Sequence, residues 1–215
     1  MNARRIACAL ALPALPLALL AGTLISPTDS TRNAVQLHAA SAHGSAWAAA
    51  ALFELLAAIV MPFAVAGVVH AVRGRGATLG GALGILGTVG MAAIAFRHMF
   101  IYGMAAIGRA QALHALDRVD QAFGPIVLPL MFFGPVAFVV LAAAAARARI
   151  APRWVPLGAF AFFVTDMLPI PGAEIVQQLV GIATFTVLAR AVLATAPTPR
   201  REEARTAMTP ASAEI

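Results

Sequence analysis

Charged residues are scarce in this sequence, and lysine is missing altogether. Only 11% of the 215 residues are charged, against roughly 25% in soluble domains. Hydrophobic residues make up 61% of the chain, and the mean hydropathy is +0.87. This shortage of charge excludes an ordinary soluble domain and indicates an integral membrane protein. We therefore expect the chain to have the lipid bilayer as its main partner.

The net charge of +6 comes entirely from arginine. A basic balance can indicate nucleic-acid binding. Here, however, the arginines sit mostly at the ends of apolar runs, where membrane topology requires them. We therefore expect no nucleic-acid partner.

Several chemical signatures are also missing. The single cysteine, Cys8, lies inside the first apolar run, so no intrachain disulfide can form. The sequence has no HExxH motif, no phosphate-binding Walker loop and no recognisable Ser–His arrangement. We therefore expect no cofactor, no metal and no assigned catalytic residue.

Long apolar runs dominate what is present. A transmembrane helix needs about 20 predominantly apolar residues. The runs predict an all-α membrane bundle of about six transmembrane helices in one domain, residues 1–194. The expected spans are 6–26, 47–70, 79–102, 125–146, 154–168 and 174–193. The first run could instead be a cleaved signal peptide, but it is long for one and lacks a prompt cleavage site.

The third span is rich in glycine. Gly76, Gly80 and Gly84 recur at every fourth position, and Thr88 and Ala92 continue the same face. This small-xxx-small pattern lets helix backbones approach closely in lipid. We expect Gly80 and Gly84 to contact another helix, either within this chain or in a homo-oligomer or partner membrane protein.

Three segments lie between or beyond the spans. Residues 27–46 are polar and are expected to form a loop. Residues 105–123 predict one amphipathic surface helix, because His114, Asp117, Arg118 and Gln121 share one helical face. Residues 195–215 are expected to be a disordered cytoplasmic tail.

The arginine distribution predicts the topology. With the N-terminus inside, eleven of the fifteen arginines fall in cytoplasmic segments. These are Arg4, Arg5, Arg73, Arg75, Arg147, Arg149, Arg153, Arg190, Arg200, Arg201 and Arg205. The positive-inside rule therefore favours a multi-pass protein of a bacterial plasma membrane with both termini cytoplasmic.

Polar residues inside the spans give the candidate site. On this topology Glu54, Arg97, His98 and Asp166 all fall in the outer part of the bundle. Charges inside hydrocarbon are costly and normally face the bundle interior in pairs. We expect these four side chains to line one outward-facing ligand pocket, with Arg97 as the shared cation and Glu54 as its partner.

Four interpretations remain open. The four residues could form only a buried ion-pair cluster that fixes helix register, without any ligand. The protein could transport a small solute or lipophilic compound, although its midplane carries almost no charge. It could be an intramembrane metal-dependent hydrolase using His98 and a carboxylate. It could also be a membrane subunit that assembles with a partner through the Gly80–Gly84 face.

Three features together resemble a known class of proteins. They are the glycine-rich run 79–90, the Ala115-Leu116-Asp117-Arg118 segment and the basic turn 149–154. Over residues 45 to 195 the chain resembles the uncharacterised small multi-pass membrane proteins of actinobacteria, a domain-of-unknown-function class. The resemblance implies a bacterial plasma membrane and a six-helix bundle, and it implies no activity.

Overall fold

A computed structural model describes residues 3–165, 167, 168, 170 and 172–195. Over these residues the chain is all-helical, as the sequence predicts, and contains seven helices. In chain order they are α1 (Ala3–Ile25), α2 (Asn33–Ala42), α3 (Gly44–Val72), α4 (Arg75–Met104), α5 (Arg109–Arg147), α6 (Val155–Thr165) and α7 (Ala173–Ala194). The predicted tail from residue 196 onward lies outside the described residues.

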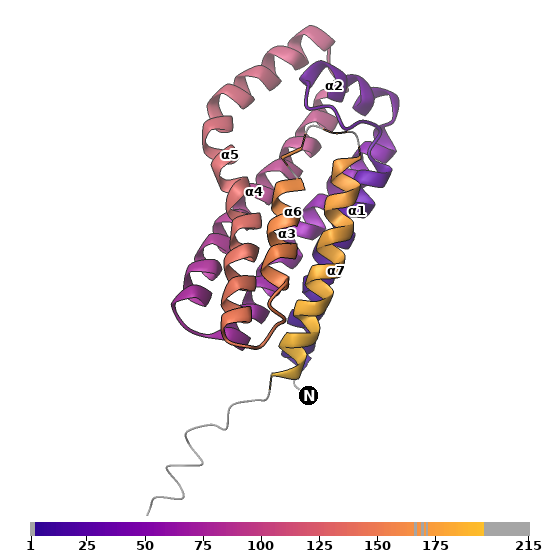
Figure 1. The fold of residues 1–215 in the computed structure, drawn as a ribbon. Helices are drawn as coiled ribbons and strands as arrows, with labels where there is room; N and C mark the ends of the chain where they lie inside the picture. Colours follow the sequence, from indigo (N-terminus) through magenta and orange to yellow (C-terminus); the bar gives the residue numbers. More distant parts are fainter. Residues whose placement is uncertain (1–2, 166, 169, 171, 196–215) are drawn as a thin grey trace, which may run out of the picture.

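Five of these helices, α1, α3, α4, α5 and α7, are long and apolar enough to cross a membrane. The expected span 154–168 is instead the short helix α6, of 11 residues. At about 1.5 Å per residue it is only about half as long as the hydrocarbon core is thick. Figure 1 shows α6 between α5 and α7, and one of its faces is exposed, with Leu157 at 69%.

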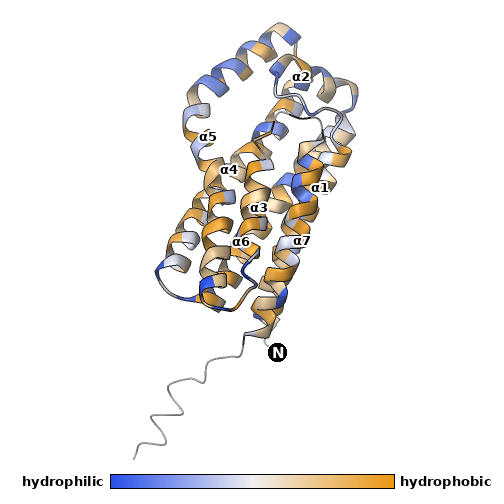
Figure 2. Ribbon diagram, in the orientation of Figure 1, coloured by the Kyte–Doolittle hydropathy of each residue, from blue (hydrophilic) through white to orange (hydrophobic). Residues whose placement is uncertain are grey.

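The two ends of the bundle differ. The start of α1 and the end of α7 lie at the same end (Figure 1). Arg5 connects them, because its Nε and Nη2 donate to the carbonyl oxygen of Val192 at 2.9 and 2.6 Å. The α3–α4 and α5–α6 connections also lie at this end, whereas α2 and the first half of α5 form the opposite end. Figure 2 shows the helices between the two ends as mainly hydrophobic.

The main core lies towards the end of the bundle that carries the termini. It includes fully buried residues from α1, α3, α5 and α7, among them Leu12, Leu15, Met61, Phe138 and Phe185. Because α1 supplies Leu12 and Leu15 to this core, it is an integral helix of the bundle. Cleaving it as a signal peptide would expose the apolar surface of its neighbours.

The glycine-rich face of α4 packs inside this chain, against α5 and α3. A Cβ atom added at Gly80 would lie 2.6 Å from Cγ of Leu141, and one at Gly84 would lie 2.6 Å from Cγ2 of Val65. At Gly87 an added Cβ would meet the backbone of Gly134 itself. The close approach expected of Gly80 and Gly84 is therefore present, and α4 and α5 come closest at Gly87 and Gly134.

Two expectations for the segments between spans are wrong. The polar segment 27–46 is not only a loop, because α2 lies within it. The amphipathic segment is not a separate surface helix, because residues 109–123 form the first part of the 39-residue helix α5, which continues through Pro125 and Pro129. Proline inside a helix removes one hydrogen bond and bends the helix, and here it does not end it.

A second, smaller hydrophobic core lies at the end of the bundle opposite the termini. It joins Leu37 and Ala40 of α2, Trp47 of α3, Ile101 of α4 and Leu116 of α5, all buried. The expected polar face of the amphipathic segment is exposed, including His114 and Asp117. The apolar stripe of the segment therefore packs onto α2, and its polar stripe faces outward.

Candidate functional site

The structure contains a large cavity at the end of the bundle away from the termini. It has a volume of about 1400 Å³. Residues of α1, α3, α4, α5, α7 and the loop 26–31 line it, together with Gln36 of α2, Thr165 of α6 and the loop residues Leu168, Ile170 and Gly172. It lies beyond the closest contact of α4 and α5, where residues 93–100 of α4 face residues 119–131 of α5.

The bend of α5 explains why the cavity is there. From Gly80 to Gly90, α4 is in contact with α5. A Cβ atom added at Gly90 would lie 2.6 Å from the backbone of Leu130 and Met131. Beyond this point Pro129 and Pro125 follow, and Figure 1 shows α5 curving away from α4 before it returns to α2. The glycines thus allow close packing of α4 against α5, and the bend at the prolines separates the two helices beside the cavity.

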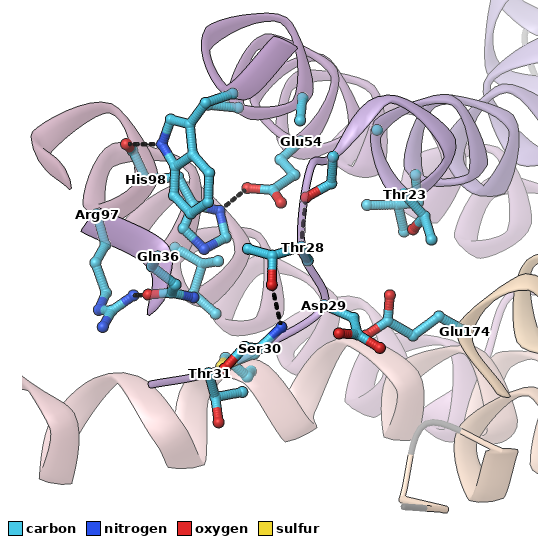
Figure 3. A pocket seen from close by; sticks show the side chains of 18 of the residues that line it. Thr23, Thr28, Asp29, Ser30, Thr31, Gln36, Glu54, Arg97, His98 and Glu174 are labelled. Atoms are coloured by element: carbon cyan, nitrogen blue, oxygen red, sulfur yellow. Dashed lines mark hydrogen bonds and ion pairs between the residues drawn. The ribbon is translucent and has the colours of Figure 1, made fainter. Parts of the chain in front are cut away.

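Three of the four predicted site residues line this cavity together: Glu54, Arg97 and His98. The fourth, Asp166, lies outside the described residues, although its neighbours Thr165 and Leu168 also line the cavity. Figure 3 shows Glu54 and His98 on one side and Arg97 with Gln36 next to them. The expected grouping at one end of the bundle is therefore present for the residues that the structure describes.

The expected pairing of Glu54 with Arg97 is wrong. Glu54 pairs with His98 instead, with Oε2 of Glu54 2.6 Å from Nδ1 of His98. Arg97 points elsewhere and pairs with Asp120, with Nε 2.8 Å from Oδ1. The depth of Arg97 along α4 suits a partner on α3, but consecutive residues on a helix point about 100° apart. It is His98, one residue on, that faces α3.

Arg97 is the centre of a polar network that joins three helices. Its Nη1 donates to Oε1 of Gln36 at 2.9 Å, and its Nη2 donates to Oδ1 of Asn33 at 2.6 Å and to Oδ2 of Asp120 at 3.0 Å. Asn33 in turn donates from Nδ2 to Asp120 and to Asp117, both at 2.9 Å. This network ties α2 and the first half of α5 to α4.

Trp47 contacts the His98 member of the Glu54–His98 pair. The indole Nε1 donates to the carbonyl oxygen of His98 at 2.8 Å. The two rings meet edge to face, with centroids 5.3 Å apart and planes at 74°. Trp47 is 4% exposed, while Glu54 and His98 are about three-quarters buried, with side-chain exposures of 25% and 21%. The pair therefore has a fixed orientation at the cavity wall.

The rest of the wall has two kinds of surface. Asp29, Thr28 and Ser30 of the α1–α2 loop, with Glu174 of α7, add polar groups to the side that holds Glu54 (Figure 3). Apart from the Arg97–Asp120 pair, the wall between α4 and α5 is mainly apolar, and several of its side chains are more than half exposed. These include Phe96 at 60%, Phe123 at 58% and Leu128 at 57%. The cavity thus has a polar side and an apolar side.

Sequence reasoning missed Asp120, Asn33, Gln36 and Trp47. A signal for Asp120 was available, since it falls on the same helical stripe as Leu116 and Phe123. A carboxylate on the apolar stripe of an amphipathic helix needs a cationic partner from the element that the stripe packs on. Among the described residues, no three His, Cys, Asp or Glu side chains are placed to share a metal ion.

Comparison with protein-family models, curated proteins and solved structures finds no match to this chain. Its function therefore has to be argued from the cavity and the groups that line it.

Proposed function

We propose that this protein binds a small amphipathic molecule in the cavity at the outer face of a bacterial plasma membrane. The observation that carries the proposal is the two-sided wall. Glu54, His98 and the α1–α2 loop offer hydrogen bonds and charge, and Phe96, Phe123 and Leu128 offer apolar surface. A molecule with a polar head and an apolar body matches both sides.

The size and the exposure of the cavity support this class of ligand. At about 1400 Å³ it exceeds the 300–1,000 Å³ typical of small-molecule pockets. Its apolar wall includes side chains that are more than half exposed, so an acyl chain or a similar body could reach it from the surrounding lipid. We propose that the ligand enters between α4 and α5 from the outer leaflet.

The distribution of arginines supports an orientation in which the cavity lies on the outer side of the membrane. Arg5, Arg73, Arg75, Arg147 and Arg153 all belong to the end of the bundle that carries the termini. The positive-inside rule assigns that end to the cytoplasm, so the cavity would face outward.

The packed core between the cavity and the end that carries the termini favours binding of the ligand over its transport across the membrane. The space between the helices there is filled by the main core, and α4 and α5 touch at Gly87 and Gly134 with Met61 packed against both. A transporter must open an alternative path near the membrane midplane. If decanol added on one side of a vesicle crossed faster with the protein than without it, transport would replace binding as the function.

A cavity-filling substitution tests the proposal. Gly124 lines the cavity, and a Cβ atom added there meets nothing within 4 Å. Gly124→Trp should therefore fill the cavity without a backbone clash. The matched control is Gly103→Trp, because Gly103 is equally open and is not among the cavity-lining residues.

The measurement is native mass spectrometry of the purified protein titrated with decanol as the probe. Wild type and Gly103→Trp should bind decanol saturably at low stoichiometry, and Gly124→Trp should lose that binding. Thermal melting of each variant establishes that it is folded. Equal binding by Gly124→Trp and Gly103→Trp would show that decanol adsorbs elsewhere, and the proposed site would be rejected.

A further inference from the structure

Arg97 is the only arginine that lines the cavity among the described residues, and four of its five N–H groups already donate within the protein. Nε, Nη1 and Nη2 all donate to Asp120, Gln36 or Asn33. Asp120 also neutralises the charge of Arg97 at 2.8 Å. An anionic head group entering the cavity would meet a guanidinium that is already paired with Asp120 and keeps one N–H group, so Arg97 is poorly suited to bind it.

The carboxylates of the wall outnumber its cations. Asp29, Glu54, Asp120 and Glu174 line the cavity, against Arg97 and the titratable ring of His98. After the Arg97–Asp120 pair and Glu174 are set aside, the carboxylates of Asp29 and Glu54 remain beside one histidine. Glu54 contacts that histidine through Oε2, and in the described part of the chain no hydrogen bond reaches its second oxygen, Oε1.

A buried hydrogen-bond acceptor lies close to this wall. Gln178 is 5% exposed, and its Oε1 has no hydrogen-bond partner among the described residues. Its Nε2 is used, because it donates to Oε1 of Gln177 at 3.1 Å. Gln178 follows Glu174 by four residues, so it lies one turn further along the same face of α7. A buried unpaired acceptor is costly, and here it lies one turn from a cavity-lining carboxylate.

We infer that the molecule bound in this cavity is a cationic amphiphile, with an ammonium or other N–H-bearing head group at Glu54 and its apolar body between α4 and α5. The inference rests on the proposed function and narrows its ligand class. Asp29 and Oε1 of Glu54 accept hydrogen bonds and carry negative charge, whereas the main donor, Arg97, uses four of its five N–H groups within the protein. A protonated amine supplies both the positive charge and the donors that this wall lacks.

Glu54 is suited to hold such a head group. Its side chain is about three-quarters buried, so solvent screens its charge less than that of a surface carboxylate. His98 and Trp47 fix its position, which leaves Oε1 as the accepting atom. Apolar residues of α4 and α5 lie on the neighbouring wall, where the body of the same molecule would pack.

Three probes that share one alkyl chain test the inference: decylamine, decanol and decanoate. Each is titrated separately into purified wild-type protein at neutral pH, and binding is followed by native mass spectrometry and by thermal shift. Decylamine should bind about tenfold more tightly than decanol, which corresponds to about 1.4 kcal/mol, because a charge-assisted hydrogen bond is roughly twice as strong as a neutral one. Decanoate should bind more weakly than either.

Glu54→Gln identifies the group responsible. The substitution keeps the size of the side chain and an oxygen for His98, and it removes the charge. It should abolish the preference for decylamine over decanol. The control is Asp117→Asn, which removes a carboxylate that does not line the cavity and should retain the preference.

The outcomes separate the two proposals. If no probe binds in a way that Gly124→Trp blocks, the proposed function fails, and this inference fails with it. If all three probes bind equally and Gly124→Trp blocks them all, the cavity binds amphiphiles and only the inferred charge preference is wrong. Tightest binding of decanoate, or a decylamine preference that survives Glu54→Gln, would also overturn the inference.

Discussion

Arg97 uses its nitrogens within the protein, and this determines what the residue does. Its guanidinium holds α2 and the first half of α5 against α4 through Gln36, Asn33 and Asp120. His98, the next residue, points instead toward α3 and Glu54. Two adjacent side chains thus serve different purposes: one fastens the helices that cover the cavity, and the other forms part of its wall.

The pairing can be checked at this scale by double-mutant cycles. Arg97→Met leaves the Asp120 carboxylate without its cation. The pair is about a quarter to a third exposed, so solvent reduces the cost below that of a fully buried pair, to about 2 kcal/mol. Unfolding in detergent should give a coupling energy above about 1 kcal/mol between Arg97→Met and Asp120→Asn.

The matched cycle pairs Arg97→Met with Glu54→Gln. These side chains have separate partners, so their effects on the free energy of unfolding should add to within about 0.5 kcal/mol. Strong coupling between Arg97 and Glu54, with none between Arg97 and Asp120, would support the pairing expected from the sequence over the one observed.

At the scale of the helices, α4 and α5 together define the cavity. Their glycine faces touch at Gly87 and Gly134, and the parts that line the cavity separate where α5 contains Pro125 and Pro129. The small-residue pattern in the sequence was enough to predict a close helix contact for α4. Which helix packs against this face could not be predicted, because a row of glycines can pack against the apolar surface of any neighbouring helix.

A pair of alanine substitutions tests this contact. At Gly87 an added Cβ meets the backbone of Gly134, which cannot move as a side chain does. Gly87→Ala should therefore destabilise the protein by about 1–3 kcal/mol, as overpacked core sites do. Gly124→Ala has open space and replaces glycine in a helix, so it should be neutral or stabilising by up to about 1 kcal/mol.

Thermal melting in one detergent compares the two variants directly. Because both changes add the same methyl group to a glycine of a helix, any difference reports the space around it. Equal melting temperatures would mean that α4 and α5 are not in backbone contact at Gly87.

The amphipathic segment shows where prediction from sequence stops. Its polar face, including His114 and Asp117, is exposed as the residue spacing predicts. Its continuity with the following span was not predicted, because the Gly124–Pro125 step is typical of a helix end. Packing of Leu116 into the small core with α2 holds the segment in place, and this contact joins residues far apart in the sequence.

At the scale of the whole molecule, the chain is an all-helical bundle with a filled core towards one end and a cavity at the other. Sequence patterns predict the helical class, the long apolar helices and the end at which polar residues gather. They do not predict the cavity, since its volume depends on the bend of α5 and on how α2 closes over it. Pairing within the site depends on helix rotation, which a count of residues along the axis leaves open.

Orientation in the membrane is the prediction that belongs to this scale. Cys8 is the only cysteine, so Cys8→Ala gives a background without thiols. In intact bacterial cells a membrane-impermeant maleimide should label Gly108→Cys, in the α4–α5 turn, and should label Arg75→Cys only after lysis. The reverse pattern would place the cavity on the cytoplasmic side and exclude a ligand from the outer leaflet.

The positions of the two tryptophans have a spectroscopic consequence. Trp47 is 4% exposed and lies at the cavity wall against His98, whereas Trp154 is 49% exposed and precedes α6 at the far end of the bundle. The intrinsic fluorescence of the protein therefore has two emitters in unlike surroundings, and only one of them adjoins the cavity. A molecule that enters the cavity perturbs the emission of Trp47 and leaves that of Trp154 unchanged, so the chain carries its own optical reporter of occupancy.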